Sequence, residues 1–148
     1  VTVTGFVTST TPYLHRSYVS VAPLRYGAGM KGKIGEAMAH GLPVVTTSVG
    51  TQGMGLSDRK NVMIADSPDS FASAVLELFT DTHLHETIRN NARQLIDDNF
   101  TSQRVAKTMI GALERICKKP AKRAKLHEKI TFIRGYLMQK FKTGIFAN

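Results

Sequence analysis

The sequence contains a single cysteine, Cys117, among 148 residues. One cysteine excludes an internal disulfide and any metal site built from several cysteines, and it is compatible with a reducing compartment. No stretch of the chain approaches the ~20 consecutive apolar residues that a membrane-spanning helix needs. The sequence also lacks internal repeats and low-complexity segments. At this length we expect one domain with a sizeable hydrophobic core.

Charge is distributed unevenly along the chain, whose formal net charge is +9. Residues 1–114 contain ten basic and ten acidic side chains and are therefore neutral overall. Residues 115–148 contain ten basic side chains and one acidic side chain, Glu128. A basic tail indicates an anionic partner, such as a phospholipid surface or nucleic acid, or serves only solubility. Because no aromatic stacking platform or nucleic-acid motif accompanies the tail, we expect no nucleic acid partner.

The most informative stretch is residues 23–47, PLRYGAGMKGKIGEAMAHGLPVVTT. Its pattern predicts the end of a strand, a glycine-rich loop, a helix, a tight turn and a second strand. The two strands are residues 19–24 and 43–47, and the helix is residues 31–40. Gly41 follows the helix, where glycine is favoured. Such a strand–helix–strand unit predicts parallel pairing with a right-handed crossover.

The start of this helix predicts an anion-binding site. A glycine loop that enters a helix exposes backbone N–H groups without intrahelical partners, and the helix dipole adds partial positive charge there. Lys31 and Lys33 oppose that dipole, so they indicate a bound phosphate or diphosphate rather than helix stability. Glu36, one turn inside the helix, is placed to accept hydrogen bonds from a ribose diol. The alternative is an ordinary turn with lysines for solubility.

A second glycine-rich loop, residues 48–56, follows the second strand. Ligands bind at the carboxyl ends of strands in parallel sheets, so this loop and residues 24–33 are expected at the same edge. Arg25 ends the first strand, where it would either pair with a phosphate or remain an ordinary surface arginine. Gln52 is a weaker polar candidate on the second loop.

The rest of the chain alternates strand and helix patterns. A strand is predicted over residues 1–7, a short helix over residues 9–16 and a strand over residues 61–65. Three longer helices are predicted to start near Ser67, Thr82 and Thr101. Their expected inward residues are Phe71, Val75 and Leu78, then Leu84, Ile88, Leu95 and Ile96, then Val105, Met109, Ala112 and Ile116.

The segment GAGMKGKIGEAMAHGLPVVTTSVGTQG resembles the donor-binding segment of the group-1 glycosyltransferases, glycosyltransferase family 4, which have the GT-B fold. The similarity covers residues 1–115, with VTVTGFV and VSVAPLRYGAG before the segment and NVMIADSPDSFASAVLELFTD after it. The resemblance implies an α/β fold class, with a Rossmann-like parallel sheet and flanking helices, as the C-terminal half of a GT-B fold. We therefore expect the chain to be the C-terminal part of a longer enzyme.

The resemblance implies metal-independent transfer of a sugar, of the hexosyltransferase type, from a nucleoside diphosphate sugar to an acceptor, without a cofactor. No Asp-x-Asp motif is present, which agrees with metal independence. Glu36 matches the second glutamate of the family's E-x7-E motif, which holds the ribose hydroxyls. Ala28 stands where the first glutamate would contact the donor sugar. The implied donor-binding residues are Arg25, Gly27, Gly29, Met30, Lys31, Gly32, Lys33, Glu36, Gly50 and Thr51.

We expect residues 1–117 to form the nucleotide-sugar-binding domain, truncated at its N-terminus, and residues 118–148 to form a basic amphipathic helix or tail. The apolar residues of the tail recur at helical spacing, as Leu126, Ile130, Ile133, Leu137 and Phe141. The N-terminal acceptor-binding domain of the same enzyme is the expected partner of the tail. An anionic membrane surface is the alternative, which predicts a location in the cytoplasm or at the membrane periphery.

Two other functions stay open. One is a non-enzymatic α/β module whose basic tail contacts an anionic membrane surface or nucleic acid. The other is a degenerate glycosyltransferase-like domain without turnover, which Ala28 favours. Catalytic residues, donor base, donor sugar, acceptor and stereochemistry stay unassigned. The chain alone is expected to catalyse little or nothing.

Overall fold

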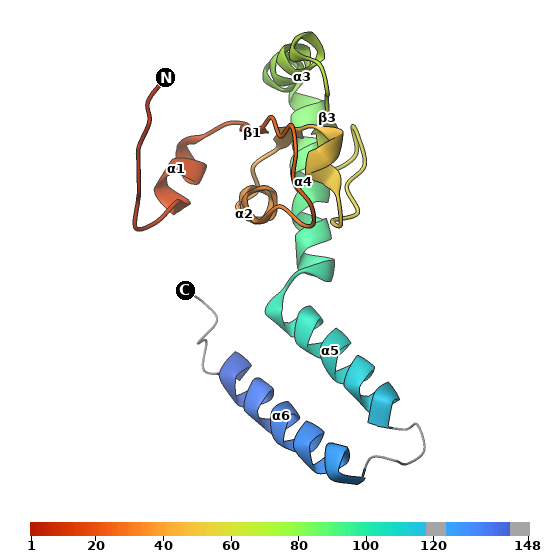
Figure 1. The fold of residues 1–148 in the computed structure, drawn as a ribbon. Helices are drawn as coiled ribbons and strands as arrows, with labels where there is room; N and C mark the ends of the chain where they lie inside the picture. The colour runs from red at the N-terminus through yellow and green to blue at the C-terminus, as the bar shows by residue number, and fades with distance from the viewer. Residues whose placement is uncertain (118–123, 143–148) are drawn as a thin grey trace. The chain divides into compact units, whose positions relative to one another are not determined.

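The structure, a computed structural model, describes residues 1–117 and 124–142 (Figure 1). The chain divides into two compact units, Val1–Asp97 and Asp98–Asn148. The first unit is an α/β unit and the second contains a pair of helices. The predicted division of function between residues 1–117 and residues 118–148 stays a prediction. Among the described residues, no helix combines the length and the apolar character needed to cross a membrane.

A three-stranded parallel sheet forms the centre of the first unit. Its strands, in spatial order, are β1 (Ser20–Ala22), β2 (Val44–Thr46) and β3 (Met63–Ile64). Ser20 pairs with Val44, and Val45 pairs with Met63. The three strands predicted from residues 19–24, 43–47 and 61–65 are thus present, each shorter than expected, and their parallel pairing is confirmed.

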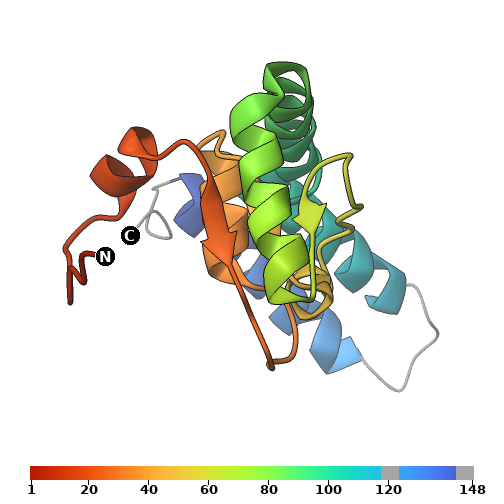
Figure 2. The same ribbon diagram turned by 90° about the horizontal axis from the view of Figure 1, so that it is seen from above.

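Helices cover both faces of this sheet (Figure 2). On one face lies α2 (Gly32–Ala39), which buries Ile34, Ala37 and Met38. On the other face lie α3 (Pro68–Thr80) and the first turns of α4 (Thr82–Asn99). The buried side chains of that second face are Val45, Met63, Ala65, Ala74, Leu78, Leu84 and Ile88. A strand covered on both sides has no polar face, which explains the apolar run that contains β2.

The turn after α2 is a Schellman motif. Gly41 has a φ of +71°, its N–H donates to the Met38 carbonyl at 2.9 Å, and the Leu42 N–H donates to the Ala37 carbonyl at 3.0 Å. A positive φ is strained for residues with a side chain, so glycine fits this position. The motif satisfies the last carbonyls of α2 and directs the chain into β2.

The predicted starts of the three longer helices are confirmed, and a side chain caps each of them. The Ser67 hydroxyl accepts from the Ser70 N–H at 3.2 Å, ahead of α3. Asp81 accepts from the Leu84 N–H at 2.9 Å, ahead of α4. Thr101 accepts from the Arg104 N–H at 3.4 Å, ahead of α5. Each cap satisfies a backbone donor that the helix itself leaves free.

The strand predicted over residues 1–7 is wrong. The described residues 1–10 form neither helix nor strand, and the side chains of Val1, Val3 and Phe6 are exposed. Alternation alone does not make a strand, because its backbone needs a neighbour to pair with, and β1 at the edge of the sheet pairs with β2 alone. The short helix that follows, α1 (Thr11–Arg16), is present as predicted.

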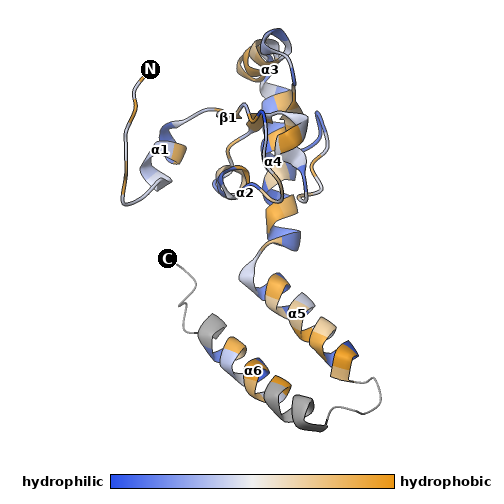
Figure 3. Ribbon diagram, in the orientation of Figure 1, coloured by the Kyte–Doolittle hydropathy of each residue, from blue (hydrophilic) through white to orange (hydrophobic). Residues whose placement is uncertain are grey.

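The second unit contains α5 (Ser102–Cys117) and α6 (Ala124–Lys142), which pack against each other. The side of α5 that faces α6 carries Ala106, Ile110, Leu113 and Cys117. The predicted inward stripe of α5 is wrong, since Val105, Met109 and Ile116 are exposed. Figure 3 shows hydrophobic residues along both helices. Because α5 carries two apolar stripes, periodicity alone could not identify the one that α6 covers.

In α6, Ile130 and Leu137 of the predicted stripe are half-buried, whereas Ile133 is exposed. The side chains of Leu126 and Phe141 lie outside the described part of the chain.

One ion pair links the loop before β3 to α3. Arg59 has a φ of 57°, and its guanidinium donates two hydrogen bonds to the carboxylate of Glu77, one of them Nη1 to Oε2 at 2.9 Å. These hydrogen bonds lower the pKa of the Glu77 carboxyl below its ordinary value. A carboxyl group with a lowered pKa stabilises the fold above its unfolded pKa, and this contribution is lost as the pH falls through the lowered value.

A carbon-13 NMR titration should therefore place the pKa of the Glu77 carboxyl below that of a free glutamate. Arg59→Gln should return it to the ordinary range, because the guanidinium that favours the ionised carboxylate is gone. An unchanged titration of Glu77 in that variant would contradict this role of the ion pair.

Candidate functional site

The carboxyl ends of β1 and β2 are joined by two threonine side chains. The Thr46 hydroxyl, buried, donates to the Ala22 carbonyl at 2.9 Å. The Thr47 hydroxyl donates to the Leu24 carbonyl at 2.6 Å. These hydrogen bonds hold the starts of the two glycine-rich loops side by side. Sequence reasoning missed them, because a threonine at the end of an apolar strand does not indicate which carbonyl it will meet.

The end of β3 is joined to the same edge through Asp66. Its Oδ1 accepts hydrogen bonds from the backbone N–H and the hydroxyl of Ser48, at 2.8 and 3.0 Å. Ser48 begins the short 3-10 helix η1 (Ser48–Thr51). A carboxylate at a helix start accepts from N–H groups that would otherwise lack a partner. This role of Asp66 was not predicted from the sequence, although a polar residue directly after a predicted strand was the available signal.

The two glycine-rich loops contact each other. Gly53 has a φ of +77°, and a Cβ added to it would lie 3.2 Å from Cγ of Met30. Met54 is buried, and its Cε lies 3.3 Å from the position of a Cβ added to Gly35 in α2. The prediction that both loops share one edge of the sheet is therefore confirmed.

The start of α2 lacks a side-chain cap in the described chain, and its first turn contains no acidic residue. The helical hydrogen bonds begin with the Ile34 N–H, which donates to the Lys31 carbonyl at 2.9 Å. The N–H groups of Gly32 and Lys33 precede that bond. Uncapped N–H groups at a helix start are suited to an anion.

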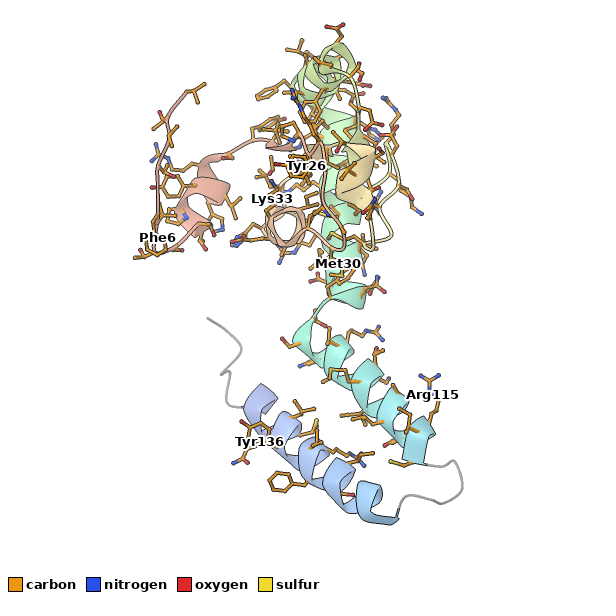
Figure 4. The ribbon with its side chains drawn as sticks, in the orientation of Figure 1. Phe6, Tyr26, Met30, Lys33, Arg115 and Tyr136 are labelled. Atoms are coloured by element: carbon orange, nitrogen blue, oxygen red, sulfur yellow. The ribbon has the colours of Figure 1, made fainter. Side chains whose placement is uncertain are left out.

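The loop before α2 depends on two glycines. Gly27 and Gly29 have φ values of +132° and +71°, which few residues with side chains adopt. The Lys31 ammonium folds back and donates to the Gly29 carbonyl at 2.8 Å. Figure 4 labels Tyr26, Met30 and Lys33 around this loop and the start of α2.

Two of the predicted cationic residues are available to a ligand. Arg25 and Lys33 are exposed, and neither has an ion-pair partner within residues 1–117 and 124–142. Lys31 is half-buried and engaged with the loop. Of the two exposed cationic residues, Lys33 therefore lies nearer along the chain to the uncapped N–H groups at the start of α2.

Glu36 lies on the side of α2 that faces α1. Its Oε1 accepts a short hydrogen bond from the hydroxyl of Thr10. One turn further along α2, Nδ1 of His40 lies 3.1 Å from Nε2 of His15. Oε2 of Glu36 has no hydrogen-bond partner in the part of the chain that the structure describes. Nothing in the sequence indicated Thr10 or His15 as neighbours of α2, since their contacts depend on where α1 lies.

The predicted residues of the second loop have different surroundings. Gly50 is buried, and a Cβ added to it would lie 2.0 Å from Oγ1 of Thr46 and 3.1 Å from Cδ1 of Ile34. Thr51 donates to the Ser48 carbonyl at 2.8 Å, within η1. Gly50 thus allows η1 to lie directly on the end of β2, and its burial gives it a packing role.

Comparison with known families identifies the chain. A family model described as Glycosyl transferases group 1 matches residues 1–81, which contain all three strands, α2 and both glycine-rich loops. The chain belongs to the group 1 glycosyl transferase family. The expected family is therefore confirmed.

Curated relatives of this group 1 glycosyl transferase are bacterial and longer. A putative glycosyltransferase YtcC of Bacillus subtilis is 36% identical over 77 residues, which are 50% of this chain and 19% of that protein. An uncharacterized 44.6 kDa protein in the cps region of Klebsiella pneumoniae is 30% identical over 87 residues, 59% of this chain and 22% of that protein. Spore coat protein SA of B. subtilis is 29% identical over 83 residues, 54% of this chain and 22% of that protein.

A solved structure confirms the fold class. The C-terminal domain of a glycosyl transferase group 1 family protein, LpcC, from Francisella tularensis has a TM-score of 0.56 with this chain at 20% identity. The similarity covers 66% of this chain and 52% of that domain. The α/β unit with its three-stranded parallel sheet therefore corresponds to the C-terminal half of a GT-B fold, as predicted.

The packing around Gly50 can be tested by substitution. Gly50→Ala should lower the free energy of unfolding by about 1–3 kcal/mol, because the added methyl group overlaps Thr46 in a closed space. Chemical denaturation of the chain measures this. Gly111→Ala, at a helical position with open space around the added methyl group, is the control and should not destabilise. Equal stability of the two variants would contradict the close packing of η1 on β2.

Proposed function

We propose that this chain supplies the donor-binding part of a glycosyltransferase, which moves a sugar from a nucleoside diphosphate sugar to an acceptor. The observation that carries the proposal is the uncapped start of α2 at the edge where the strands end, with Lys33 at its first turn and Glu36 one turn on. Membership of the group 1 family supports the same assignment. The proposal also includes an acceptor and an N-terminal domain of the longer protein that would bind this acceptor.

The diphosphate would lie against the start of α2. Backbone N–H groups of Gly32 and Lys33, the glycine-rich loop from Gly27 and the charge of Lys33 would surround it. Negative charge develops on the leaving nucleoside diphosphate as the glycosidic bond breaks. Donors already fixed in the folded protein stabilise that charge without further reorganisation. The transfer would thus rely on protein donors rather than on a metal ion.

The ribose would lie against Glu36. An ionised carboxylate offers about four acceptor sites, of which the Thr10 hydroxyl takes one on Oε1. Oε2 would accept from one ribose hydroxyl, and the second hydroxyl would share Oε1 with Thr10 or replace it. Thr10 therefore belongs to the proposed ribose site, although no sequence motif indicated it.

The position of Ala28 separates two versions of the proposal. Ala28 carries no carboxylate to contact the donor sugar, so a donor-binding domain without turnover is the second candidate. Both versions predict nucleotide binding by this chain, and only the first predicts sugar transfer by the longer protein. An Ala28→Glu variant of that longer protein, assayed for sugar transfer, discriminates between them. A gain of transfer in this variant would favour the second version, in which the natural protein lacks turnover because the carboxylate is missing.

The proposed role of Glu36 predicts a dependence on the ribose 2′-hydroxyl. With the nucleoside diphosphate that binds best among those of uracil, guanine, adenine and cytosine, Glu36→Gln should weaken binding about tenfold or more, since a hydrogen bond to a charged group contributes ~1.5–3 kcal/mol. The 2′-deoxy nucleotide should bind the wild-type chain more weakly, and Glu36→Gln should remove most of that difference. Calorimetric titration of the four combinations measures both effects.

Glu86→Gln is the matched control for Glu36→Gln, because Glu86 is also an exposed helical carboxylate but lies on α4, away from the proposed site. It should leave both affinities unchanged. If the losses of affinity from the 2′-deoxy nucleotide and from Glu36→Gln are additive, Glu36 does not contact the ribose 2′-hydroxyl. No binding of any of the four diphosphates to the folded chain would contradict the donor site itself.

The proposed diphosphate contact predicts a selective effect of Lys33. Lys33→Gln should weaken the nucleoside diphosphate about fivefold, since an exposed charge pair contributes up to ~1 kcal/mol, and it should leave the nucleoside alone unaffected. Lys60→Gln, also exposed, is the control and should alter neither. An equal loss for nucleoside and diphosphate would mean that Lys33 does not face the phosphates.

A further inference from the structure

The helix α6 has two unlike sides. One side faces α5, where Ile130 and Arg134 border the space between the two helices and Arg134 pairs with Glu114 at 3.5 Å. The opposite side carries Phe132, Ile133 and Tyr136, which we term the outer face of α6. Figure 4 shows Tyr136 projecting from α6 away from α5.

The side chains of the outer face of α6 are exposed to solvent. Phe132, Ile133 and Tyr136 are 76%, 45% and 53% exposed. Phe132 and Tyr136 are four residues apart, so they lie on the same side of the helix, and Ile133 is three residues before Tyr136. Isolated exposed apolar residues are ordinary in proteins, whereas a contiguous group that includes two aromatic rings marks an interaction surface.

The surrounding sequence is strongly basic. The range of α6, residues 124–142, contains five basic residues and one acidic residue. Residues 115–123 add five basic residues and no acidic one, while residues 1–114 are neutral. This excess of basic residues in the sequence of the tail favours an anionic partner.

We propose that α6 lies on an anionic lipid surface through its outer face. Phe132, Ile133 and Tyr136 enter the boundary between headgroups and acyl chains, where aromatic rings are favoured, and the net positive charge of the tail sequence attracts the lipid phosphates. A neutral protein surface would cover the apolar residues but would supply no negative charge to interact with the basic residues of the tail. The surface is independent of the proposed donor site, which lies in the first unit.

Cosedimentation of the chain with lipid vesicles tests the proposal. The chain should bind vesicles of phosphatidylcholine mixed with phosphatidylglycerol, bind phosphatidylcholine alone far more weakly, and dissociate as the salt concentration rises. Replacing both Phe132 and Tyr136 with serine should lower the partition coefficient about tenfold. Phe6→Ser removes a ring that is even more exposed, at 93%, from the first unit and should leave the partition unchanged.

Several outcomes would overturn the proposal. They are absence of binding to the anionic vesicles, equal binding to both vesicle types, and equal losses in Phe6→Ser and the double variant. Anionic-vesicle binding that the double variant retains in full would also overturn it, because the basic residues alone would then account for binding.

A second measurement does not require the double variant to fold. The chain contains no tryptophan, so Tyr136→Trp places a single fluorescent reporter on the outer face of α6. Its emission should shift to shorter wavelength with anionic vesicles and be quenched by brominated lipid. Phe6→Trp should show neither change. If the emission of the Tyr136→Trp variant stays at its free value while the protein is bound to vesicles, α6 faces water and not lipid.

Discussion

Burial of β2 on both faces is the constraint on which the first unit depends. Val44, Val45 and Thr46 have no exposed surface, so α2 must cover one side of the strand while α3 and α4 cover the other. A parallel strand reached through a helix begins and ends at fixed edges of the sheet. The loops after β1 and β2 therefore emerge together, and the proposed donor site is a consequence of how the core is covered.

The two ends of α2 differ in how their backbone groups are satisfied. The C-terminal end is closed by the Schellman turn at Gly41, whereas the N-terminal end has no side-chain cap and carries Lys33 against the helix dipole. An uncapped start lowers helix stability by about 1 kcal/mol relative to a capped one. The caps at Ser67 and Asp81 show that the same sequence uses capping residues elsewhere. The open start of α2 is thus a local departure that fits a ligand-binding role.

Much of this unit followed from sequence because its signals are local. Glycines at turns, caps at helix starts and an apolar run between them each depend on neighbouring residues, and the strands and helices they predict are present. The contact of Thr10 with Glu36 could not be predicted, since it depends on where α1 lies. The failed strand at residues 1–7 and the wrong face of α5 have one physical cause. A pattern shows that a face is apolar, but only a partner decides whether it is buried.

Met30 and Gly53 bring the two glycine-rich loops into direct contact. A Cβ added to Gly53, whose φ is positive, would lie 3.2 Å from Cγ of Met30, so a side chain at position 53 would require the Met30 side chain to move. The shape of the edge is accordingly set by both loops at once. A substitution in one loop at this contact therefore affects the other loop, even though the two positions are 23 residues apart in the sequence.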